Sequence, residues 1–285
     1  MNGVHLDDMN DQGISILGCG WLGMEVAKRL IAKGYQVKGS TTRAEKAELL
    51  LGAAIQPYVF SLLSDKIEGT LGDFLESPLL LLNIPPGRRD PDVGRTFPLK
   101  IATLLKQVPN KSNLKCIWVS STSVYGNLSG EVREGHALSP ATQSGKALVE
   151  VEEMVQAAIP HTTILRMGGL VGPKRHPGKF LAGRQNLRGA NQAINLIHLV
   201  DCVGIIEAVI EQNCWGEDFN CVSDGHPTRE AYYTYAAKIL KLPLPEFADD
   251  DPSIGKTILN EKVKERLGYS FQYSDPFDML ANKMA

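Results

Sequence analysis

Apolar residues recur in two alternating patterns along the first part of the chain. A short apolar run at residues 13–18 is followed, at residues 21–34, by apolar positions at helical spacing that end at Gly34. Residues 35–42 then have the composition of a second strand, and residues 43–52 have the pattern of a second helix. The chain therefore predicts strands that are joined in order by helices.

Four further apolar runs predict additional strands. They lie at residues 55–60, 78–85, 114–122 and 162–172. The runs at 78–85 and 114–122 are continuous, which is typical of strands that helices cover on both faces. Strands that alternate with helices predict an α/β fold with a Rossmann-type, doubly wound parallel sheet.

The texture of the sequence changes after residue 171. Residues 172–192 are basic, Gly-rich and irregular, and small helices joined by Pro-containing loops follow toward the end of the chain. We therefore predict a Rossmann domain at 13–171, to which 195–222 return, and a smaller C-terminal region at 172–285. The carboxyl edge of an open α/β sheet is where ligands bind, so the smaller region is expected to bind the substrate there.

The composition narrows the classes of function. The 285 residues carry a formal net charge of −2 and are 43% hydrophobic, as in ordinary globular proteins. This near-neutral charge offers no electrostatic basis for binding nucleic acid or an anionic membrane. The five cysteines are scattered without CxxC pairs, which argues against a zinc site and a disulfide framework, and we expect no metal.

The amino terminus bears on the location of the protein. Residues 1–12 are rich in acidic and amide side chains, where a signal peptide requires a basic segment and an apolar core. No apolar run approaches the ~20 residues of a membrane-spanning helix. We therefore expect a cytoplasmic protein without a membrane partner.

The segment after the first predicted strand indicates a nucleotide site. Gly18, Gly20 and Gly23 form a G-x-G-x-x-G pattern between an apolar strand and an amphipathic helix. The first glycine permits a tight turn, the second lets backbone amides approach a pyrophosphate, and the third allows close packing of helix on strand. The helix N-terminus then provides an anion site. The alternative is a Gly-rich turn without a ligand.

The end of the second predicted strand distinguishes two cofactors. An acidic residue there would accept hydrogen bonds from the ribose of NAD, whereas a basic residue would suit the additional phosphate of NADP. In residues 39–46, GSTTRAEK, the first carboxylate is that of Glu45. The polar side chains before it are Ser40, Thr41, Thr42 and Arg43. Hydroxyl donors and a guanidinium favour NADP over NAD. A solvated Arg43 in the first turn of a helix is the alternative.

The rest of the sequence resembles one enzyme family. VSSTSVYG, at residues 119–126, resembles the active-site strand of the extended short-chain dehydrogenase/reductases, the NAD-dependent epimerase/dehydratase family. LRMGGLVGP, NLIHLVDCV, FNCVSDG and EKVKERLGYSF resemble later segments of that family in the same order. More narrowly, ILGCGWLG, STSVYG, SGK and RHPGKF together resemble an atypical bacterial branch, the YeeZ-like proteins.

This resemblance implies catalytic positions and one departure from them. Ser121 matches the family residue that hydrogen-bonds the reacting oxygen of the substrate, and Lys146 matches the lysine that binds the nicotinamide ribose. In the family, a tyrosine four residues before that lysine is the general acid/base. Here Thr142 occupies that position, and its hydroxyl is too weak an acid and too short to replace a phenol. Tyr125 is a candidate replacement, with a pocket-shaping role as the alternative.

The resemblance also places other side chains near the ligands. It puts Arg175, His176 and Lys179 in the segment that lines the substrate pocket, where cations would suit an anionic substrate; a solvated basic loop is the alternative. It implies a structural role for His198 and a helix N-cap for Asp201. The expected dinucleotide contacts are Gly18, Cys19, Gly20, Trp21, Leu22, Gly23, Thr41, Thr42, Arg43, Asn83, Pro85 and Lys146.

Two functions remain open from the sequence. The first is an NAD(P)-dependent oxidoreductase or epimerase/dehydratase-like enzyme that acts on a small anionic or sugar-like substrate. The second is a catalytically degenerate NADP-binding sensor or partner-binding module. Retention of Ser121 and Lys146 favours the enzyme, whereas Thr142 favours the module. A homodimer is compatible with the family, although residues 146–158 show no distinctive apolar patch.

Overall fold

The computed structural model describes residues 13–87, 90–109, 111–248 and 253–280. Residues 1–12, from which we expect that the protein has no signal peptide, lie outside these ranges. The chain divides into two compact units. Unit 1 comprises the chain up to Ser120 with Thr142–Leu165 and Val209–Glu217, and unit 2 comprises Ser121–Ala141, Arg166–Ala208 and the chain from Asp218. The boundary between independent domains at residue 172 stays a prediction.

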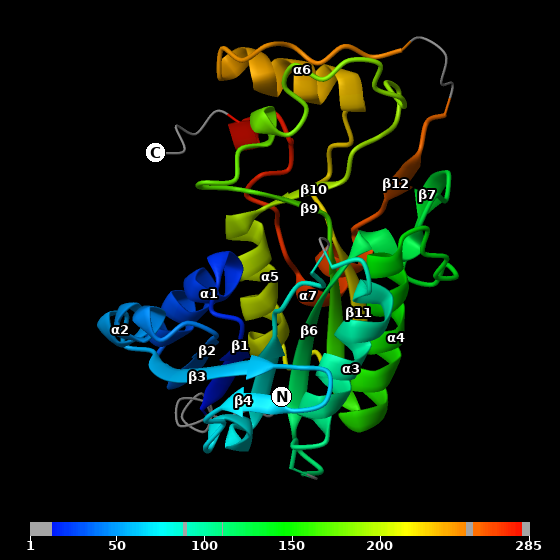
Figure 1. The fold of residues 1–285 in the computed structure, drawn as a ribbon. Helices are drawn as coiled ribbons and strands as arrows, with labels where there is room; N and C mark the ends of the chain where they lie inside the picture. The colour runs from blue at the N-terminus through cyan, green and yellow to red at the C-terminus, as the bar shows by residue number, and fades with distance from the viewer. Residues whose placement is uncertain (1–12, 88–89, 110, 249–252, 281–285) are drawn as a thin grey trace. The chain divides into compact units, whose positions relative to one another are not determined.

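An eight-stranded sheet organises the fold, in the strand order β11-β8-β6-β5-β1-β2-β3-β4 (Figure 1). Its strands are β1 (Ile14–Leu17), β2 (Val37–Thr41), β3 (Gln56–Leu62), β4 (Ile67–Gly69), β5 (Leu79–Leu82), β6 (Lys115–Ser121), β8 (His161–Met167) and β11 (Asp218–Cys221). The pairings from β6 through β5, β1 and β2 to β3 are parallel, and β4 is antiparallel to β3. The mostly parallel sheet and its flanking helices confirm the predicted Rossmann-type architecture.

The apolar pattern explains the centre of the sheet. All four residues of β1 and all four of β5 are buried, and Ile16 lies opposite Leu81 in the parallel register. Continuous apolar strands of this kind are stable only where helices cover both faces of the sheet. The helix α1 (Trp21–Ala32) buries Leu22, Val26 and Leu30, the positions at helical spacing.

The described residues form six further α-helices. They are α2 (Glu45–Gly52), α3 (Val93–Leu105), α4 (Gln143–Ala158), α5 (Leu199–Glu211), α6 (Arg229–Ile239) and α7 (Glu261–Leu267). Short 3-10 helices are η2 (Phe74–Glu76), η3 (Thr122–Tyr125), η4 (Pro177–Lys179) and η5 (Asp278–Leu280). Within unit 1, α3 and α4 pack against each other.

The predicted strand at 162–172 is divided in the structure. Its first part is β8, and its second part is β9 (Gly169–Val171), which pairs with β10 (Leu196–His198) in a separate two-stranded sheet. The Gly168 amide donates to the Cys221 carbonyl, 2.9 Å away, whereas the next amide, of Gly169, donates to Asn195. The chain therefore changes its hydrogen-bonding partner at this glycine pair, which a continuous apolar run could not reveal.

Unit 2 also contains elements that the sequence did not predict. The strands β7 (Gly130–Val132) and β12 (Lys256–Ile258) form a parallel pair although they are far apart in the chain. A buried cluster joins β9, β10, α6 and η5 through Val171, Leu196, Tyr232, Ala236 and Met279. Its aromatic ring contacts include Tyr232 with Phe277, at 5.6 Å between centroids.

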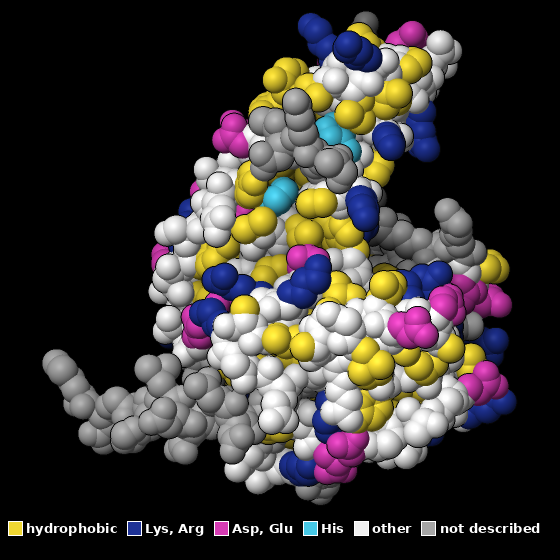
Figure 2. Space-filling model, turned by 90° about the vertical axis from the view of Figure 1, so that its left-hand side faces the viewer, with side chains coloured by type: hydrophobic (Ala, Val, Ile, Leu, Met, Phe, Trp, Pro, Cys, Tyr) yellow, Lys and Arg dark blue, Asp and Glu magenta, His cyan; other side chains and the backbone are white. Residues whose placement is uncertain are grey.

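The surface carries both charge signs and some apolar side chains. Figure 2 shows dark blue cationic and magenta anionic side chains on the same face, with hydrophobic side chains between them, as expected for a net charge of −2. Among the helices within the described ranges, each is too short or too polar to cross a membrane.

Candidate functional site

The Gly-rich loop of unit 1 has the backbone that its glycines predict. Gly18 follows β1 with φ of +90°, and a Cβ there would lie 2.4 Å from the Asn83 carbonyl oxygen. A Cβ on Gly23 would lie 2.3 Å from the Gly18 carbonyl oxygen. Both glycines are therefore required by the close approach of backbone to backbone. The three glycines lie where α1 begins, as the motif predicts.

Hydrogen bonds fasten this loop to the neighbouring strand ends. The Gly18 amide donates to the Ser40 Oγ at 2.8 Å, and the Cys19 amide donates to the Ser40 carbonyl at 3.0 Å. Asn83 donates through Nδ2 to the Gly18 carbonyl at 3.2 Å. Its backbone amide donates to the Leu17 carbonyl at 2.9 Å. The Ser40 hydroxyl, which the sequence offered as a phosphate ligand, thus accepts the Gly18 amide.

The middle of the loop leaves room for a ligand. Apart from Gly20 and its chain neighbours, no described atom lies within 4 Å of the position that a Cβ on Gly20 would occupy. Gly20 is the N-cap of α1 and has no side chain to accept the first amides of that helix. An open space beside uncapped amides fits a pyrophosphate, which accepts such hydrogen bonds.

Cys19 has a packing role in this loop. It is buried, and its Sγ occupies the space beside Gly39, where a Cβ would lie 2.6 Å from the sulfur. Burial raises the pKa of the Cys19 thiol to about 12. A thiol that remains protonated contributes volume rather than a nucleophile. Cys19 would therefore face a dinucleotide with its backbone. Of its predicted neighbours, Leu22 is buried and Trp21 is half-buried.

The residues predicted to select the cofactor are exposed to different degrees. Thr41 is nearly buried, and its Oγ1 accepts the Arg43 amide at 3.2 Å. The Arg43 side chain is 58% exposed and its Nε lies 3.7 Å from Glu45 Oε1. Since a solvated ion pair of this kind is weak, the guanidinium can exchange Glu45 for a phosphate. Thr42 and Pro85 are exposed, and Asn83 is half-buried.

Thr142 caps the helix that carries Lys146. The Thr142 Oγ1 accepts the Gly145 amide at 3.0 Å, and the extended backbone of Thr142 is typical of an N-cap. The side chain of Lys146, one turn into the helix, is exposed. No side chain in the described ranges hydrogen-bonds or ion-pairs with its ammonium. The threonine at the family's tyrosine position therefore stabilises the helix start.

We expect Thr142→Ala to lower the free energy of unfolding by about 1 kcal/mol, because it leaves an amide at the start of α4 without its side-chain acceptor. Urea denaturation of the two proteins measures this difference. Thr142→Ser is the matched control, since a serine hydroxyl can cap equally well. Equal destabilisation by the serine and alanine variants would show that the cap is not the cause.

A buried hydrogen bond links α4 to the strand β6. Glu152 is only 2% exposed, and its carboxylate accepts a hydrogen bond from the Ser120 hydroxyl at the end of β6. Both residues belong to unit 1. Glu152 was not among the residues that the sequence singled out. Its position one turn from the buried Leu148 and Val155 was the available signal.

Ser121 and Tyr125 lie at the two ends of one turn in unit 2. Ser121 is the N-cap of η3, and its Oγ accepts the Ser123 amide at 3.2 Å. Its own hydroxyl proton has no acceptor in the described ranges. Tyr125 ends the turn and is fully buried. The structure therefore leaves the Ser121 hydroxyl with a free donor but encloses Tyr125.

Two polar side chains hydrogen-bond to the Tyr125 hydroxyl. This hydroxyl donates to Asn220 Oδ1 at 2.8 Å and accepts from the Arg166 guanidinium at 2.9 Å. Arg166 is 5% exposed and also donates to Asp218 at 2.8 Å. Burial raises the pKa of Tyr125 to about 12, although the Arg166 charge opposes this shift. These contacts favour the structural interpretation of Tyr125 over a role as proton donor.

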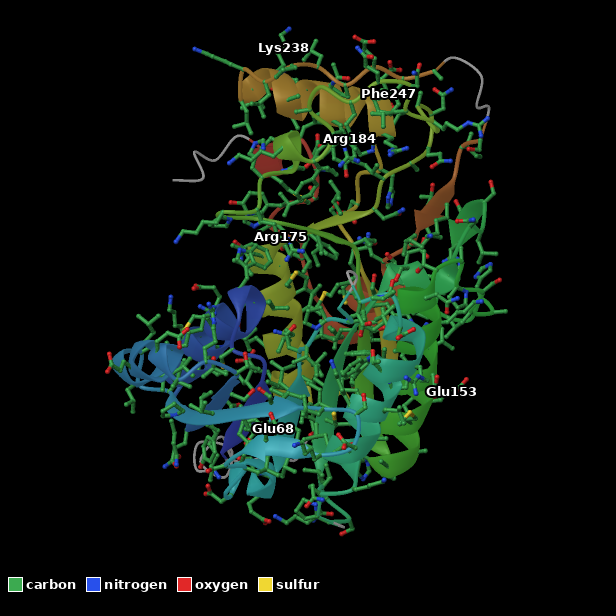
Figure 3. The ribbon with its side chains drawn as sticks, in the orientation of Figure 1. Glu68, Glu153, Arg175, Arg184, Lys238 and Phe247 are labelled. Atoms are coloured by element: carbon green, nitrogen blue, oxygen red, sulfur yellow. The ribbon has the colours of Figure 1, made fainter. Side chains whose placement is uncertain are left out.

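The predicted basic loop divides into three parts of unit 2. Arg175 is exposed at the turn after β9, where its amide donates to the Gly172 carbonyl at 2.9 Å. His176 and Lys179 flank or end η4, which packs on α6. Arg184 lies on a segment whose carbonyl accepts the Glu246 amide, and Figure 3 shows it near α6 while Arg175 lies beside β9 and β10. These cations therefore do not form one continuous loop surface.

His176 is the most constrained member of this group. Its Nδ1 accepts the Gly178 amide at 3.0 Å, and burial together with Lys179 lowers the pKa of its imidazole. The Nε2 atom is buried without a hydrogen-bond partner in the described part of the chain. A neutral imidazole with a free nitrogen can donate a hydrogen bond there, since Nδ1 is the acceptor.

His198 and Asp201 have contacts within unit 2 that explain their burial. The His198 ring stacks on Tyr273, with 3.8 Å between centroids, and burial lowers the pKa of His198. Asp201 lies in the first turn of α5. Its carboxylate accepts from the Tyr269 hydroxyl and from the amides of Gln272 and Tyr273. The predicted N-cap at Asp201 is therefore wrong, because α5 begins at Leu199 and the Asp201 carboxylate accepts hydrogen bonds from the C-terminal segment instead.

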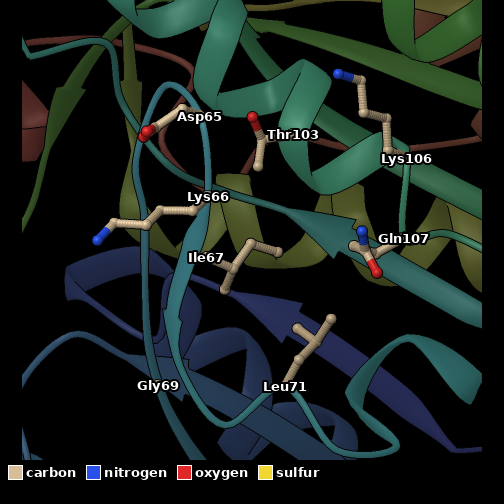
Figure 4. A pocket seen from close by; sticks show the side chains of 8 residues that line it. All are labelled: Asp65, Lys66, Ile67, Gly69, Leu71, Thr103, Lys106 and Gln107. Atoms are coloured by element: carbon tan, nitrogen blue, oxygen red, sulfur yellow. The ribbon is translucent and has the colours of Figure 1, made fainter.

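A cavity of about 410 Å³ lies elsewhere in unit 1 (Figure 4). Its lining residues come from β4, from the residues on either side of this strand and from the end of α3, and they include Lys66, Thr103 and Gln107. None of the predicted site residues lines it. The end of α3 leads toward the start of β6, whereas ligands of open α/β sheets bind at the carboxyl ends of the strands. This cavity is therefore separate from the Gly-rich loop.

Comparison with known proteins places these features in a family. No family model matches the chain. Protein YeeZ of Escherichia coli is 34% identical over 277 residues, which cover 93% of this chain and 98% of the relative. UDP-glucuronic acid 4-epimerase from Bacillus cereus, solved in complex with NAD, has a TM-score of 0.75 at 20% identity and covers 94% of this chain and 96% of its own.

A second solved structure supports the same fold. A putative NAD-dependent epimerase/dehydratase from Methylobacillus flagellatus has a TM-score of 0.74 at 22% identity, with 95% of this chain and 96% of that chain covered. Such low identities establish the fold, whereas the curated relative establishes the family. This chain therefore belongs to the YeeZ family, and it has the fold of the NAD-dependent epimerases and dehydratases among the extended short-chain dehydrogenase/reductases.

Proposed function

We propose that the protein is a nicotinamide-dinucleotide-dependent oxidoreductase of the epimerase/dehydratase type. The observation that carries this proposal is the Gly-rich loop. Backbone atoms leave no space for a side chain at Gly18 or Gly23, whereas Gly20 faces open space. A loop built only for tight packing has no need of a glycine at position 20. The similar fold of an epimerase solved with NAD supports the same cofactor class.

The proposal gives Ser121 and Lys146 separate roles. The exposed Lys146 ammonium binds the ribose hydroxyls, as a cation with three donors can. The Ser121 hydroxyl uses an acceptor lone pair on the Ser123 amide, so its proton can be donated to the reacting oxygen of the substrate. When bound, a nicotinamide dinucleotide supplies hydride transfer.

The proton must come from a group other than residue 142. The Thr142 oxygen is engaged at the start of α4, and an aliphatic hydroxyl is a poor acid. Water or an acidic group of the substrate fits this requirement better than Tyr125, whose hydroxyl is buried between Asn220 and Arg166. Tyr125 contributes to the proposed site by fixing the turn that begins at Ser121.

The substrate is proposed to be small and anionic or sugar-like. Lys179 and Arg175 are exposed cations of unit 2, and His176 offers one unpartnered ring nitrogen in the described chain. Cations and a neutral donor suit a carboxylate or phosphate. The epimerase from Bacillus cereus acts on a sugar that carries a carboxylate, which supports this class by analogy of fold.

A second candidate function is an NADP-binding sensor or partner-binding module. Thr142 favours it, because the residue at the family's acid/base position has become a helix cap. This module would keep the dinucleotide site and lose turnover. Both candidates share a cytoplasmic location, with which five free cysteines agree, and both allow a homodimer.

Titration with NADP and NAD tests the proposal. We expect NADP to bind more tightly than NAD, and Arg43→Ala to weaken NADP about 10-fold, because one charge-assisted hydrogen bond to the additional phosphate is lost. NAD affinity should be unchanged in this variant. Isothermal titration calorimetry gives both constants, and Arg95→Ala, at an exposed position on α3, is the control.

Three outcomes would contradict parts of this proposal. If neither dinucleotide binds below millimolar concentrations, both candidate functions fail. If NADP binds equally well to Arg43→Ala, the preference for NADP is not set by this residue. Absence of turnover in a substrate screen that follows reduced nicotinamide absorbance, with tight NADP binding retained, would favour the sensor.

A further inference from the structure

Lys256 is a cation of unit 2 to which neither the sequence motifs nor the proposed mechanism assigns a role. It begins β12, where it lies opposite Gly130 of β7 in the parallel register. Its side chain is half-buried, and its ammonium donates to the carbonyl oxygen of Gly126. Burial lowers the pKa of this lysine. The position is unusual because lysine side chains are mostly solvated.

The ammonium has donors to spare. It carries three N–H groups, and Gly126 accepts one of them. No carboxylate in the described ranges forms an ion pair with it. A partly buried cation without a counter-charge is unfavourable, and an anion that binds to it offsets this cost.

The backbone around Lys256 is held from several directions. Asn195 donates to the Lys256 carbonyl at 2.9 Å and accepts the Ile258 amide at 2.7 Å, so one side chain clamps both ends of β12. The Gly130 amide donates to the Gly255 carbonyl at 2.9 Å. The lysine therefore projects from a fixed strand rather than a loose loop, as binding groups in preorganised sites do.

The acceptor of the ammonium belongs to the turn that begins at Ser121. Gly126 follows η3 with φ of +58°, and a Cβ there would lie 1.8 Å from the Ser139 carbonyl oxygen, so this end of the turn is fixed. Ser121 caps the other end. At ~2 Å per residue, the five steps from Ser121 to Gly126 separate the two ends of the turn by about 10 Å. That distance suits two polar groups on one small molecule.

A purely structural role explains less of this arrangement. A lysine is a poor choice for holding one carbonyl, because a neutral donor would do so without burying a charge. The same ammonium can donate to a carbonyl and to an oxyanion at the same time. Its placement beside the turn of Ser121 would then bring a bound oxyanion close to that turn.

We propose that Lys256 anchors an anionic group of the substrate, a carboxylate or a phosphate, beside the turn that presents Ser121. This inference rests on the proposed function, because it takes Ser121 to face the substrate. It adds a residue outside the motifs and a requirement that the substrate carry an oxyanion a short distance from its reacting oxygen.

Nuclear magnetic resonance of the full chain, labelled with [13C]lysine, tests this proposal. The Lys256 signal is assigned by its absence in Lys256→Arg, and inorganic phosphate and acetate are titrated in separate arms at constant ionic strength with chloride. We expect a saturating shift of the Lys256 signal with half-saturation at about 10 mM, as one charge-assisted contact provides. The pKa of Lys256 should rise at saturation.

Control positions and variants make the outcome decisive. Lys238, exposed on α6, should show only a small linear shift (Figure 3). In 15N-labelled Lys256→Gln, which can still donate to Gly126, the shifts that added anion causes at the Gly130 and Ile258 amides of the 15N-labelled unmodified chain should disappear. Saturation with phosphate alone or acetate alone identifies the anion that is anchored.

A Lys256 response that matches that of Lys238 in both arms would overturn the proposal, whatever the cofactor affinity. Failure of the proposed function is measured separately, by the absence of dinucleotide binding. If the chain binds NADP but Lys256 shows no response to either anion, the proposed function stands and the proposed anchor at Lys256 is wrong.

Discussion

Replacing Gly20 by alanine is expected to weaken dinucleotide binding about 100-fold, because the added methyl group displaces a pyrophosphate from two amide hydrogen bonds of roughly 1.5 kcal/mol each. The melting temperature should change little, since outside residue 20 and its chain neighbours no described atom lies within 4 Å of the new Cβ. Affinity is measured by isothermal titration with NADP and stability by thermal denaturation. Loss of binding without loss of stability is the signature of a glycine kept for a ligand.

Two other glycines provide matched comparisons. Gly18→Ala should lose both binding and stability, by about 2 kcal/mol, because φ is +90° and the Asn83 carbonyl is in the way. Gly52→Ala, at the end of α2 with open space around it, should leave NADP affinity unchanged and should not lower stability, because alanine is favoured over glycine within a helix. Unchanged NADP affinity in Gly20→Ala would show that no phosphate approaches this loop.

Replacing Arg166 by methionine is expected to lower the free energy of unfolding by about 3 kcal/mol, because it removes the buried cation that donates to Asp218 and to the Tyr125 hydroxyl and leaves Asp218 with the longer contact to Lys262. Arg166 is almost completely buried. Tyr125→Phe should cost about 1 kcal/mol through the lost hydroxyl contacts. Since the residues share one hydrogen bond, the double variant should be less destabilised than the sum.

Urea denaturation of the four proteins gives the required cycle. Arg133→Met is the control, because Arg133 pairs with Glu261 at the surface, and such pairs contribute little. Full additivity of Arg166→Met and Tyr125→Phe would mean that the two side chains do not interact. NADP affinity that survives Tyr125→Phe, together with turnover in a substrate screen, would agree with a structural role for this tyrosine.

The sequence determined the parallel sheet and the Gly-rich loop. The strands β1 and β5 were evident because a continuous apolar run must be covered on both faces, whatever the rest of the chain does. Gly18 and Gly23 were evident because the turn from strand to helix is steric and local. The cap at Thr142 is also a local contact, made to an amide three residues later, but it was not predicted from the sequence.

Only the tertiary structure decided which side chains remain available for chemistry. Tyr125 is four residues from Ser121 in sequence, yet its hydroxyl contacts Asn220, 95 positions away, while the Ser121 hydroxyl keeps a free donor. Lys256 meets Gly126 across 130 positions. Local periodicity and sterics are encoded in neighbouring residues. Contacts between distant residues depend on the path of the whole chain, because closing a long loop is decided by all the packing that encloses it.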